Sequence, residues 1–340
     1  MRFLQAHEGQ ATFTMAVKNS STAFWISSLA NGELIETTLH EPAVNEVRVR
    51  TLYSGISRGT ETLVFSGKVP ASEHERMRAP FQEGDFNFPV KYGYINIGIV
   101  EQGPTALQGQ TVFCLYPHQT CFNVPSESVT VIPANVPPAR AVLAANMETA
   151  INAIWDAQPC IGDRLSIVGA GVLGTLVAYL ASRIVGCEVQ LIDINPERAE
   201  LATRLGLAFA LPQSAARDRD IVIHTSASAA GLNCALELAG FEATVLELSW
   251  FGSQSPAINL GQAFHSQRLQ IKSSQVGHVA TIQRSRWTYQ RRLALALSLL
   301  DHESLDNLIS GESAFCDLPA TLSWLNTDGN TSLCHRIKYN

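Results

Sequence analysis

Short apolar runs separated by turns characterise the first 140 residues of the chain. Polar and apolar side chains alternate from Glu46 to Leu52, which is the pattern of a half-buried strand. Further apolar runs bounded by glycine or proline follow at 98–100, 111–115 and 128–133. Residues 66–90 are polar and rich in proline and glycine, and they predict a long loop that serves as a lid or an insertion.

Near residue 140 the pattern changes to alternating helices and strands. Helix patterns cover 139–157, 173–186, 196–206 and 231–239, and buried-strand patterns cover 164–168, 188–194, 220–226, 243–252 and 269–276. Strands that alternate with helices at this spacing predict right-handed crossovers and a parallel, doubly wound sheet of the Rossmann type. A long helix is expected around 284–301, and the tail from 303 to 340 returns to loop and strand patterns.

These patterns predict an α/β protein of two domains, which suits a length of 340 residues. Residues 141–302 form the predicted domain of alternating strands and helices. Residues 1–140 form a strand-rich domain, and the tail, too short to fold alone, is expected to complete it.

Composition narrows the class of protein. The chain is 46% hydrophobic with a net charge of −6, which fits a globular protein and argues against nucleic acid as a partner. Its apolar runs are short, and residues 1–13 lack the features of a signal peptide, so we expect no membrane partner and a cytoplasmic location. Four arginines lie between apolar residues and predict a solvated helix face rather than an anion site: Arg284, Arg286, Arg291 and Arg292.

Seven cysteines are scattered without any CxxC pair. This odd, dispersed set predicts reduced thiols, and it excludes a structural zinc site built from four closely spaced cysteines.

A glycine-rich turn carries the clearest chemistry. Ile167 to Gly174 reads G-x-G-x-x-G between a predicted strand and a predicted helix. Gly169 permits the tight turn, Gly171 lets the backbone approach a pyrophosphate, and Gly174 allows close packing. The helix begins at Val172 and Leu173, whose free N–H groups attract phosphate. The turn therefore predicts a bound dinucleotide.

Asp193 ends the next predicted strand and bears on the choice of cofactor. A carboxylate there accepts hydrogen bonds from a ribose 2′-hydroxyl and repels a 2′-phosphate, so NAD(H) is favoured over NADP(H). Arg198 leaves NADP(H) open if its side chain turns toward the site. Backbone contacts to the cofactor are also expected at the carboxyl ends of two later strands, at Thr225, Ser226, Leu248 and Ser249.

With these parts in order, the chain resembles the medium-chain dehydrogenase/reductase superfamily, the proteins similar to zinc alcohol dehydrogenase. Three segments carry the resemblance: SGISRGTE at 54–61, GYINIG at 93–98 and NMETAINA at 146–153. The first is most similar to the branch that contains bacteriochlorophyllide hydroxyethyl dehydrogenase. The resemblance implies a GroES-like catalytic domain, a cleft between the domains and a homodimer formed through the Rossmann domain. It also implies hydride transfer at a carbonyl, an alcohol or an activated double bond of a small molecule.

The chain departs from the zinc-binding members at their metal ligands. The positions that hold a cysteine, a histidine and a cysteine or glutamate in those members correspond to Ser57, Tyr94 and Glu148. A serine hydroxyl and a phenol are poor zinc ligands, so no catalytic zinc is expected. Arg58 follows the first lost ligand, where the resemblance implies an arginine against the cofactor pyrophosphate; a surface salt bridge is the alternative.

Without a metal, a side chain must handle the proton. Tyr94 is the leading candidate because a phenol donates to a developing alkoxide; alternatively, it fills the space of the missing metal. Ser57 and Thr60 are candidates for a proton relay, or for capping a turn. Glu148 opens a helix, where a carboxylate acts in catalysis or favours the helix dipole. His118 has no partner visible in the sequence.

We therefore expect a zinc-independent, NAD(H)-dependent oxidoreductase acting on a carbonyl or secondary alcohol. The alternative is a dinucleotide-binding sensor or partner protein that has lost catalysis. A zinc-dependent alcohol or polyol dehydrogenase with unusual ligands is a third hypothesis.

Overall fold

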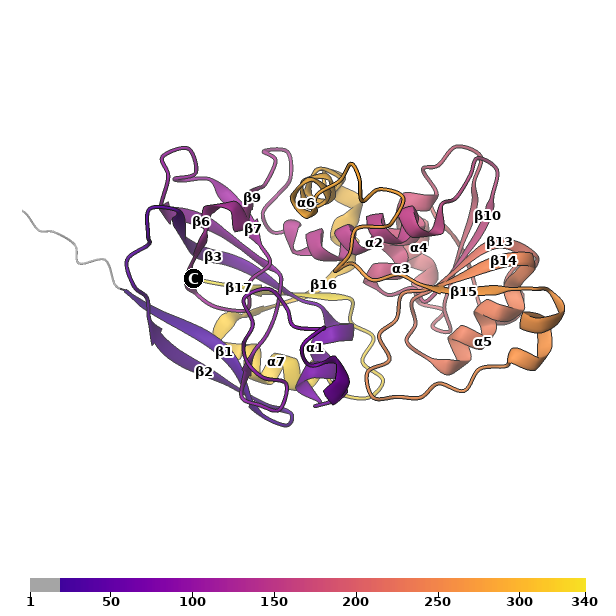
Figure 1. Ribbon diagram of the computed structural model, residues 1–340, viewed down its shortest axis with the longest axis horizontal. Coiled ribbons are helices and arrows are strands. Elements are labelled where there is room, and N and C mark those ends of the chain that lie inside the picture. Colours follow the sequence, from indigo (N-terminus) through magenta and orange to yellow (C-terminus); the bar gives the residue numbers. More distant parts are fainter. Residues whose placement is uncertain (1–18) are drawn as a thin grey trace, which may run out of the picture.

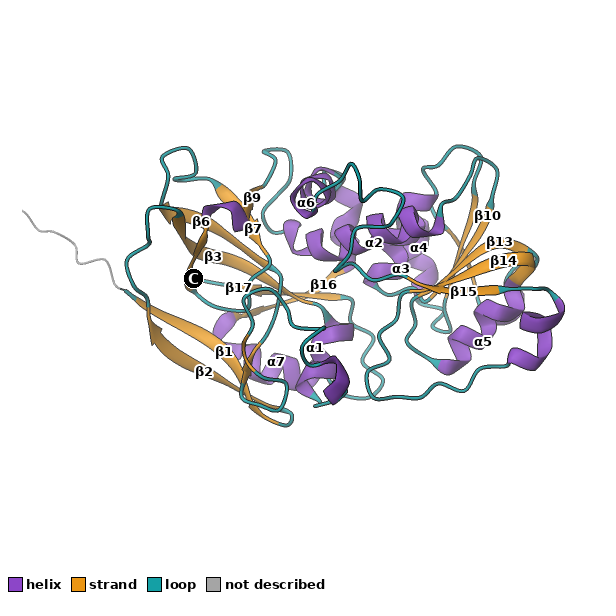
Figure 2. Ribbon diagram, in the orientation of Figure 1, coloured by secondary structure: helices purple, strands orange, loops and turns teal. Residues whose placement is uncertain are grey.

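The computed structural model describes residues 19–340, so the prediction for residues 1–13 lies outside the described residues. Three sheets with flanking helices form two halves that lie side by side along the longest axis (Figure 1). One half is rich in strands, and the other alternates strands with helices (Figure 2). The predicted α/β fold, with a Rossmann sheet beside a strand-rich part, is confirmed.

Six parallel strands form the Rossmann sheet in the order β12-β11-β10-β13-β14-β15. The strands are β10 (Arg164–Val168), β11 (Glu188–Ile192), β12 (Ala208–Ala210), β13 (Arg219–His224), β14 (Ala239–Glu247) and β15 (Gln270–Ser273). Helices α3 (Val172–Ala181), α4 (Arg198–Arg204) and α5 (Ala229–Leu238) connect them. The chain runs outward from β10 to β12 and then returns to β13 on the other side of β10. The strand order thus reverses between β10 and β13, the position where open α/β sheets bind ligands.

The strand-rich half contains the other two sheets. One has the order β2-β1-β5-β4, and the second has the order β16-β17-β3-β6-β7-β9, with β8 paired to β3. Their bounds are β1 (Ser20–Ser28), β2 (Asn31–Thr38), β3 (Glu46–Ile56), β4 (Glu83–Gly84), β5 (Val90–Lys91), β6 (Asn96–Gln102), β7 (Thr111–Cys114), β8 (Cys121–Pro125), β9 (Val129–Val131), β16 (Ile309–Ala314) and β17 (Cys334–Lys338). Helices α1 (Arg58–Phe65) and α7 (Leu318–Leu325) pack against each other in this half.

The end of the chain returns to this half. Strand β17 pairs antiparallel with β3, so that His335 lies opposite Ile56, and β16 adds in parallel to β17. In Figure 1 the yellow β16, β17 and α7 lie among the indigo and purple elements. The start of β17 thereby approaches the start of α1, where the predicted catalytic groups stand.

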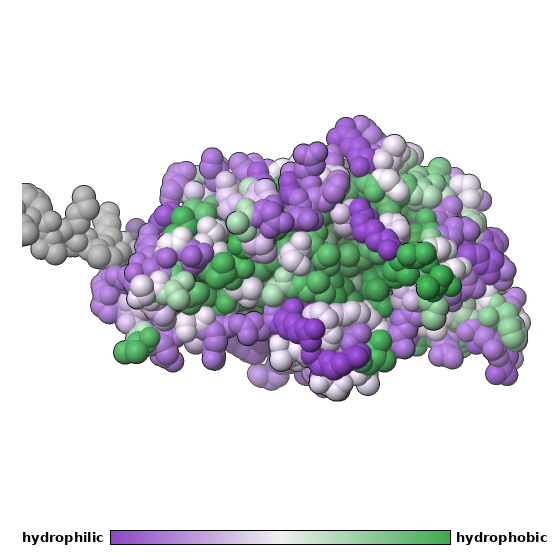
Figure 3. Space-filling model, turned by 90° about the horizontal axis from the view of Figure 1, so that it is seen from above, coloured by the Kyte–Doolittle hydropathy of each residue, from purple (hydrophilic) through white to green (hydrophobic). Residues whose placement is uncertain are grey.

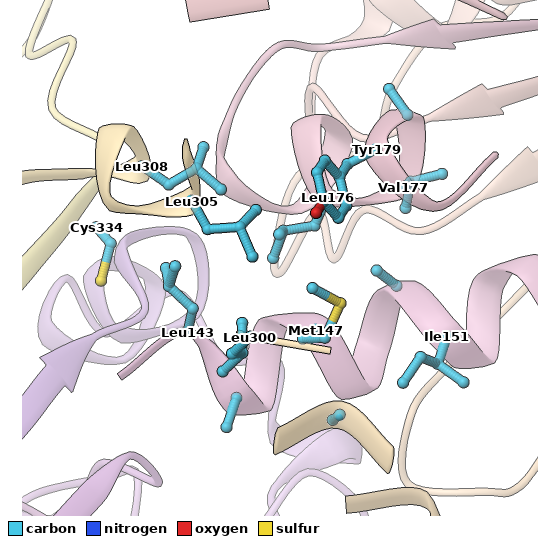
Figure 4. Packing of buried hydrophobic residues seen from close by; sticks show 14 of the residues in the cluster. Leu143, Met147, Ile151, Leu176, Val177, Tyr179, Leu300, Leu305, Leu308 and Cys334 are labelled. Carbon is cyan, nitrogen blue, oxygen red and sulfur yellow. The ribbon is translucent and has the colours of Figure 1, made fainter. Parts of the chain in front are cut away.

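Helix α2 (Ala144–Ala157) links the halves through apolar packing. Its side chains Met147 and Ile151, and Leu143 just before it, belong to the same buried cluster as Leu176 of α3 and Leu305 of the tail. Figure 4 shows these side chains filling the space between α2, α3 and the tail. On the face seen in Figure 3, apolar residues gather near the middle and polar residues surround them.

Two predictions about elements are wrong in part. Helix α6 (Tyr289–Ser298) is shorter than the expected 284–301, because Thr288 caps it by accepting the Arg291 N–H at 3.1 Å. Residues 66–90 are more than a lid or an insertion: Val69, Phe86 and Val90 are buried in one cluster with the strand residue Phe24.

In the described part of the chain, none of the helices is long and apolar enough to cross a membrane. The seven cysteines, all within residues 19–340, are free thiols, as their scattered spacing predicts.

Candidate active site

The glycine-rich turn follows β10 directly and is built as its sequence predicts. Gly169 has φ of +112°, and a Cβ there would meet Thr225 Oγ1 at 2.7 Å. A Cβ on Gly174 would overlap the carbonyl oxygen of Gly169. A Cβ on Gly171 would meet no atom within 4 Å. The first and third glycines are therefore required by packing, whereas the second leaves an open approach for a ligand.

Helix α3 begins at this opening. Gly171 is its N-cap and has no side chain, so the N–H groups of Val172 and Leu173 receive no side-chain cap. These groups and the positive end of the helix dipole suit an anionic ligand such as a phosphate.

Asp193 lies at the end of β11 and braces the same turn. Its Oδ2 accepts the Ala170 N–H at 2.7 Å, and its Oδ1 accepts the Asn195 N–H at 2.8 Å. Each carboxylate oxygen has the capacity for a second hydrogen bond, so the side chain remains suited to ribose hydroxyls.

The two arginines predicted near the cofactor both bind the loop that precedes β17. Arg58 donates to the carbonyl of Ser332 at 3.0 Å, and Arg198 donates to the carbonyl of Thr331. Burial lowers the pKa of Arg58, and the positive charge of Arg198 lowers it further. The two guanidinium groups lie near each other because they bind adjacent carbonyls of this loop. Burial lowers the pKa of Arg198, and the negative charge of Asp193 partly offsets that effect. Neither forms the surface salt bridge considered for Arg58.

At the end of β13, Thr225 holds the glycine turn in place. Its hydroxyl donates to the carbonyls of Val168 at 3.1 Å and Gly169 at 2.9 Å. The Leu248 N–H donates to the His224 carbonyl at 3.0 Å, which ties the ends of β13 and β14 together. The predicted positions thus meet at the crevice where the strand order reverses.

The sequence did not predict a set of hydrogen bonds around His224, at the carboxyl ends of β13 and β14. The buried His224 ring contacts Glu247 Oε2 through Nδ1 at 2.6 Å and Ser226 Oγ through Nε2 at 2.7 Å. Ser249 joins because its N–H donates to Glu247 Oε1 at 2.7 Å. The signal in the sequence is a single histidine inside the buried strand run DIVIH.

In the strand-rich half, Tyr94 lies against the start of α1. It is half-buried, and the polar side chains of Ser57 and Thr60 lie close to its phenol. Burial, and next the charge of Glu61, raise the pKa of Tyr94 to about 12, whereas the nearby Ser57 and Thr60 side chains lower it. The structure brings these three predicted residues together, and the phenol is protonated at neutral pH.

Near Tyr94, Glu61 and His118 form a buried pair that the sequence did not predict. Glu61 Oε2 contacts His118 Nε2 at 2.9 Å, with exposures of 3% and 1% for the two side chains. His118 Nδ1 contacts Ser54 Oγ at 2.7 Å, and Ser54 Oγ contacts the Tyr339 hydroxyl at 2.9 Å. Glu61 lies four residues after the N-cap position Ser57, one more than the capping-box spacing, so no standard pattern in the sequence signals its contact to the Ser57 N–H.

Glu148 is not brought to this group. Its Oε1 accepts from Arg292 Nε at 3.1 Å, and both side chains are almost fully buried. Burial raises the pKa of Glu148, and Arg292 lowers it. Arg292 also donates to Asn152 at 2.6 Å, so the prediction of a solvated face is wrong for this arginine.

The residues at the three positions of the zinc ligands do not fit a metal. Ser57 and Tyr94 offer only hydroxyl groups, and the Glu148 carboxylate is paired with Arg292. Thiolate, imidazole and free carboxylate, the groups that zinc prefers, are not supplied by this set.

Comparisons with known proteins agree with the fold. No protein-family model matches the chain. D-guloside 3-dehydrogenase from Escherichia coli (strain K12) is 22% identical over 285 residues, which are 73% of this chain and 79% of the relative. 2-dehydro-3-deoxy-L-galactonate 5-dehydrogenase from Pseudoalteromonas atlantica is 24% identical over 321 residues, which are 85% of this chain and 90% of the relative.

Two solved structures are similar along nearly their whole length. The short chain alcohol dehydrogenase rspB from Escherichia coli CFT073, complexed with NADH, has a TM-score of 0.73 at 17% identity, covering 94% of this chain and 99% of its own. A dehydrogenase from Sinorhizobium meliloti 1021 bound to NADP has a TM-score of 0.74 at 17% identity, with the same coverage. The chain therefore shares the fold of these dehydrogenases.

Proposed function

We propose that this protein is a nicotinamide-dependent dehydrogenase of the medium-chain dehydrogenase/reductase superfamily. The observation that carries the proposal is the turn at Gly169–Gly174, because it is open only at Gly171 and faces the point where the strand order reverses. The names of the relatives, all dehydrogenases, support the same class of reaction.

NAD(H) is the cofactor that we propose. The carboxylate of Asp193 stands beside the turn, where it accepts hydrogen bonds from ribose hydroxyls and repels a 2′-phosphate. Arg198, the side chain that would favour NADP(H), is engaged with the loop carbonyl of Thr331.

The proposed reaction does not use zinc and relies on Tyr94 for the proton. A bound nicotinamide supplies the exchange of a hydride with the substrate carbon. Tyr94 donates its phenolic proton to the alkoxide that forms from a carbonyl, and it takes the proton back in the reverse direction. The Ser57 and Thr60 hydroxyls, which lie close to the phenol, then stabilise the phenolate by donating hydrogen bonds to its oxygen during the reaction.

The direct test is binding followed by turnover. Titration of the purified protein with NADH and NADPH should give affinity about tenfold or more in favour of NADH, since Asp193 disfavours the 2′-phosphate. A panel of polyols, sugar acids and their ketones should then yield nicotinamide absorbance changes without added metal. Binding without turnover on the whole panel would favour the sensor. Turnover that is lost on chelation and restored by zinc would contradict the zinc-independent reaction.

We also propose that two copies of the chain associate through the Rossmann sheet. Strand β15 is the end of that sheet, and all four of its residues are exposed, including the apolar Ile271. An exposed sheet edge of this kind pairs readily with another strand. Ile271→Lys should yield monomers by light scattering, whereas Val131→Lys, on an exposed position of the strand-rich half, should leave the dimer intact. A wild-type monomer would refute this association.

A further inference from the structure

Two cysteines meet at the end of the Rossmann sheet where strands β10 and β11 begin. Cys187 is partly buried, and its Sγ donates to the carbonyl oxygen of Cys160 at 3.2 Å. Cys160 is exposed, and its own Sγ contacts the Gln158 carbonyl at 3.9 Å. A contact of that length is weak, so the Cys160 thiol turns about its Cα–Cβ bond at little cost.

The backbone fixes this approach. Residues 160–163 form a turn in which the Asp163 N–H donates to the Cys160 carbonyl at 3.2 Å, and the Asp163 carboxylate accepts the Cys160 N–H at 2.7 Å. Arg164 and Glu188 are partners across the parallel strands, and the Glu188 N–H donates to the Asp163 carbonyl at 3.0 Å. The turn therefore holds Cys160 beside the strand pair that begins next to Cys187.

The remaining separation is small. A carbonyl oxygen lies about 2.4 Å from the Cα of its own residue, so Cys187 Sγ is within about 5.6 Å of the Cys160 Cα. A disulfide places each sulfur roughly 3.5–4.5 Å from the Cα of its partner. The two turns already touch, because a Cβ on Gly186 would lie 3.4 Å from the Gly162 nitrogen. Rotation of the exposed thiol and a shift of about 1–2 Å in a surface turn would close the bond.

We infer that Cys160 and Cys187 are a peroxide-sensitive thiol pair that closes reversibly into a disulfide. Both are free thiols in this structure, which is the reduced form. Disulfides that form on oxidation between exposed, neighbouring thiols are the kind that sense redox state rather than hold a fold together.

The oxidation takes place in two steps. The exposed Cys160 sulfur, as thiolate, attacks one oxygen of hydrogen peroxide; the O–O bond breaks, and the departing hydroxide takes up the thiol proton as water. Cys160 is then a sulfenic acid. The Cys187 thiolate attacks its sulfur, the S–O bond breaks, and the second hydroxide leaves with the Cys187 proton as water. The two thiols lose two electrons in total, and the peroxide gains them.

The bond would enclose the segment proposed to bind the cofactor. The cysteines are 27 residues apart, and β10, the Gly169–Gly174 turn and α3 all lie between them. A cross-link restricts the unfolded chain, so the oxidised protein should be the more stable form. The sulfurs lie before the start of β10 and the glycine turn follows its end, roughly 16 Å away for five residues, so the crevice at the turn stays open.

The test treats the full-length protein with a small excess of hydrogen peroxide and maps its cysteines. After the remaining thiols are blocked, trypsin releases Cys160 in residues 141–164 and Cys187 in residues 184–198. Mass spectrometry should find these two peptides joined, about 2 Da lighter than their sum, and separate after dithiothreitol. The oxidised protein should also unfold about 5 °C higher than the reduced protein.

Single variants identify the pair. Cys160→Ser and Cys187→Ser should both abolish the rise in Tm. In Cys187→Ser the sulfenic acid on Cys160 has no thiol to resolve it, so dimedone should trap it. Cys316→Ser is the matched control, since Cys316 is also exposed and lies in the strand-rich half, and it should keep both the link and the rise in Tm.

Four results would overturn the inference: no reaction with peroxide, a rise in Tm that survives in either variant, a link from Cys160 to a second copy of the chain, or oxidised Cys160 without a link to Cys187. None of these measurements requires cofactor or substrate. An inactive wild-type protein would therefore contradict the proposed function and leave the result for the thiol pair standing.

Discussion

Gly171→Val separates cofactor binding from folding more clearly than other single changes at the turn. The Cβ of residue 171 meets no atom within 4 Å, and the residue lies at φ of −75°, which valine adopts without strain. The fold should therefore be retained, with about 1 kcal/mol lost because valine is a poorer N-cap than glycine. That loss corresponds to a decrease of a few degrees in Tm.

The ligand should be affected far more strongly. The valine side chain occupies the open approach to the first N–H groups of α3, so about two hydrogen bonds to a charged phosphate are lost. At about 1.5–2 kcal/mol each, these bonds amount to about 3–4 kcal/mol, which is roughly a 100- to 1000-fold rise in Kd for NADH. Isothermal titration with NADH, together with thermal unfolding, measures both quantities on the same preparation.

The comparison variant is Gly174→Ala. Its Cβ would overlap the Gly169 carbonyl oxygen, so this smaller change should lower Tm more than Gly171→Val does. NADH affinity in Gly171→Val within threefold of wild type would refute the assignment of the opening to the pyrophosphate.

Two further predictions concern the other half of the site and the core beside it. Tyr94→Phe should lower turnover at least tenfold with little change in NADH affinity, because the phenol acts on the substrate; unchanged turnover in stopped-flow assays would remove it from the mechanism. Arg292→Leu should cost about 3–5 kcal/mol in the free energy of unfolding, since Glu148 would remain buried without its partner. Burial already raises the pKa of Glu148, so the folded state binds its proton more tightly than the unfolded state does. The loss in Arg292→Leu should therefore grow as pH rises above the ordinary carboxyl pKa of about 4 and shrink below it. Denaturant titrations at several pH values would show this, and a loss independent of pH would contradict it.

Short-range patterns in the sequence were sufficient to predict much of the fold and the cofactor-binding turn. The Gly169–Gly174 turn, the alternation of strands and helices after residue 140 and the acid at Asp193 were all predicted, because each depends on residues close together in the chain. The same holds for the grouping of Ser57, the N-cap residue of α1, with Thr60 on its first turn.

Only the tertiary structure decided how the acids are paired. Glu148 and Arg292 are 144 residues apart, and Glu61 and His118 are 57 apart, so no periodicity connects them. An arginine among apolar residues and a glutamate in a helix look like surface groups until the packing of α2 against α6 excludes water from both. Which charges are buried, and therefore which groups remain free for chemistry, depends on the contacts between segments distant in the sequence.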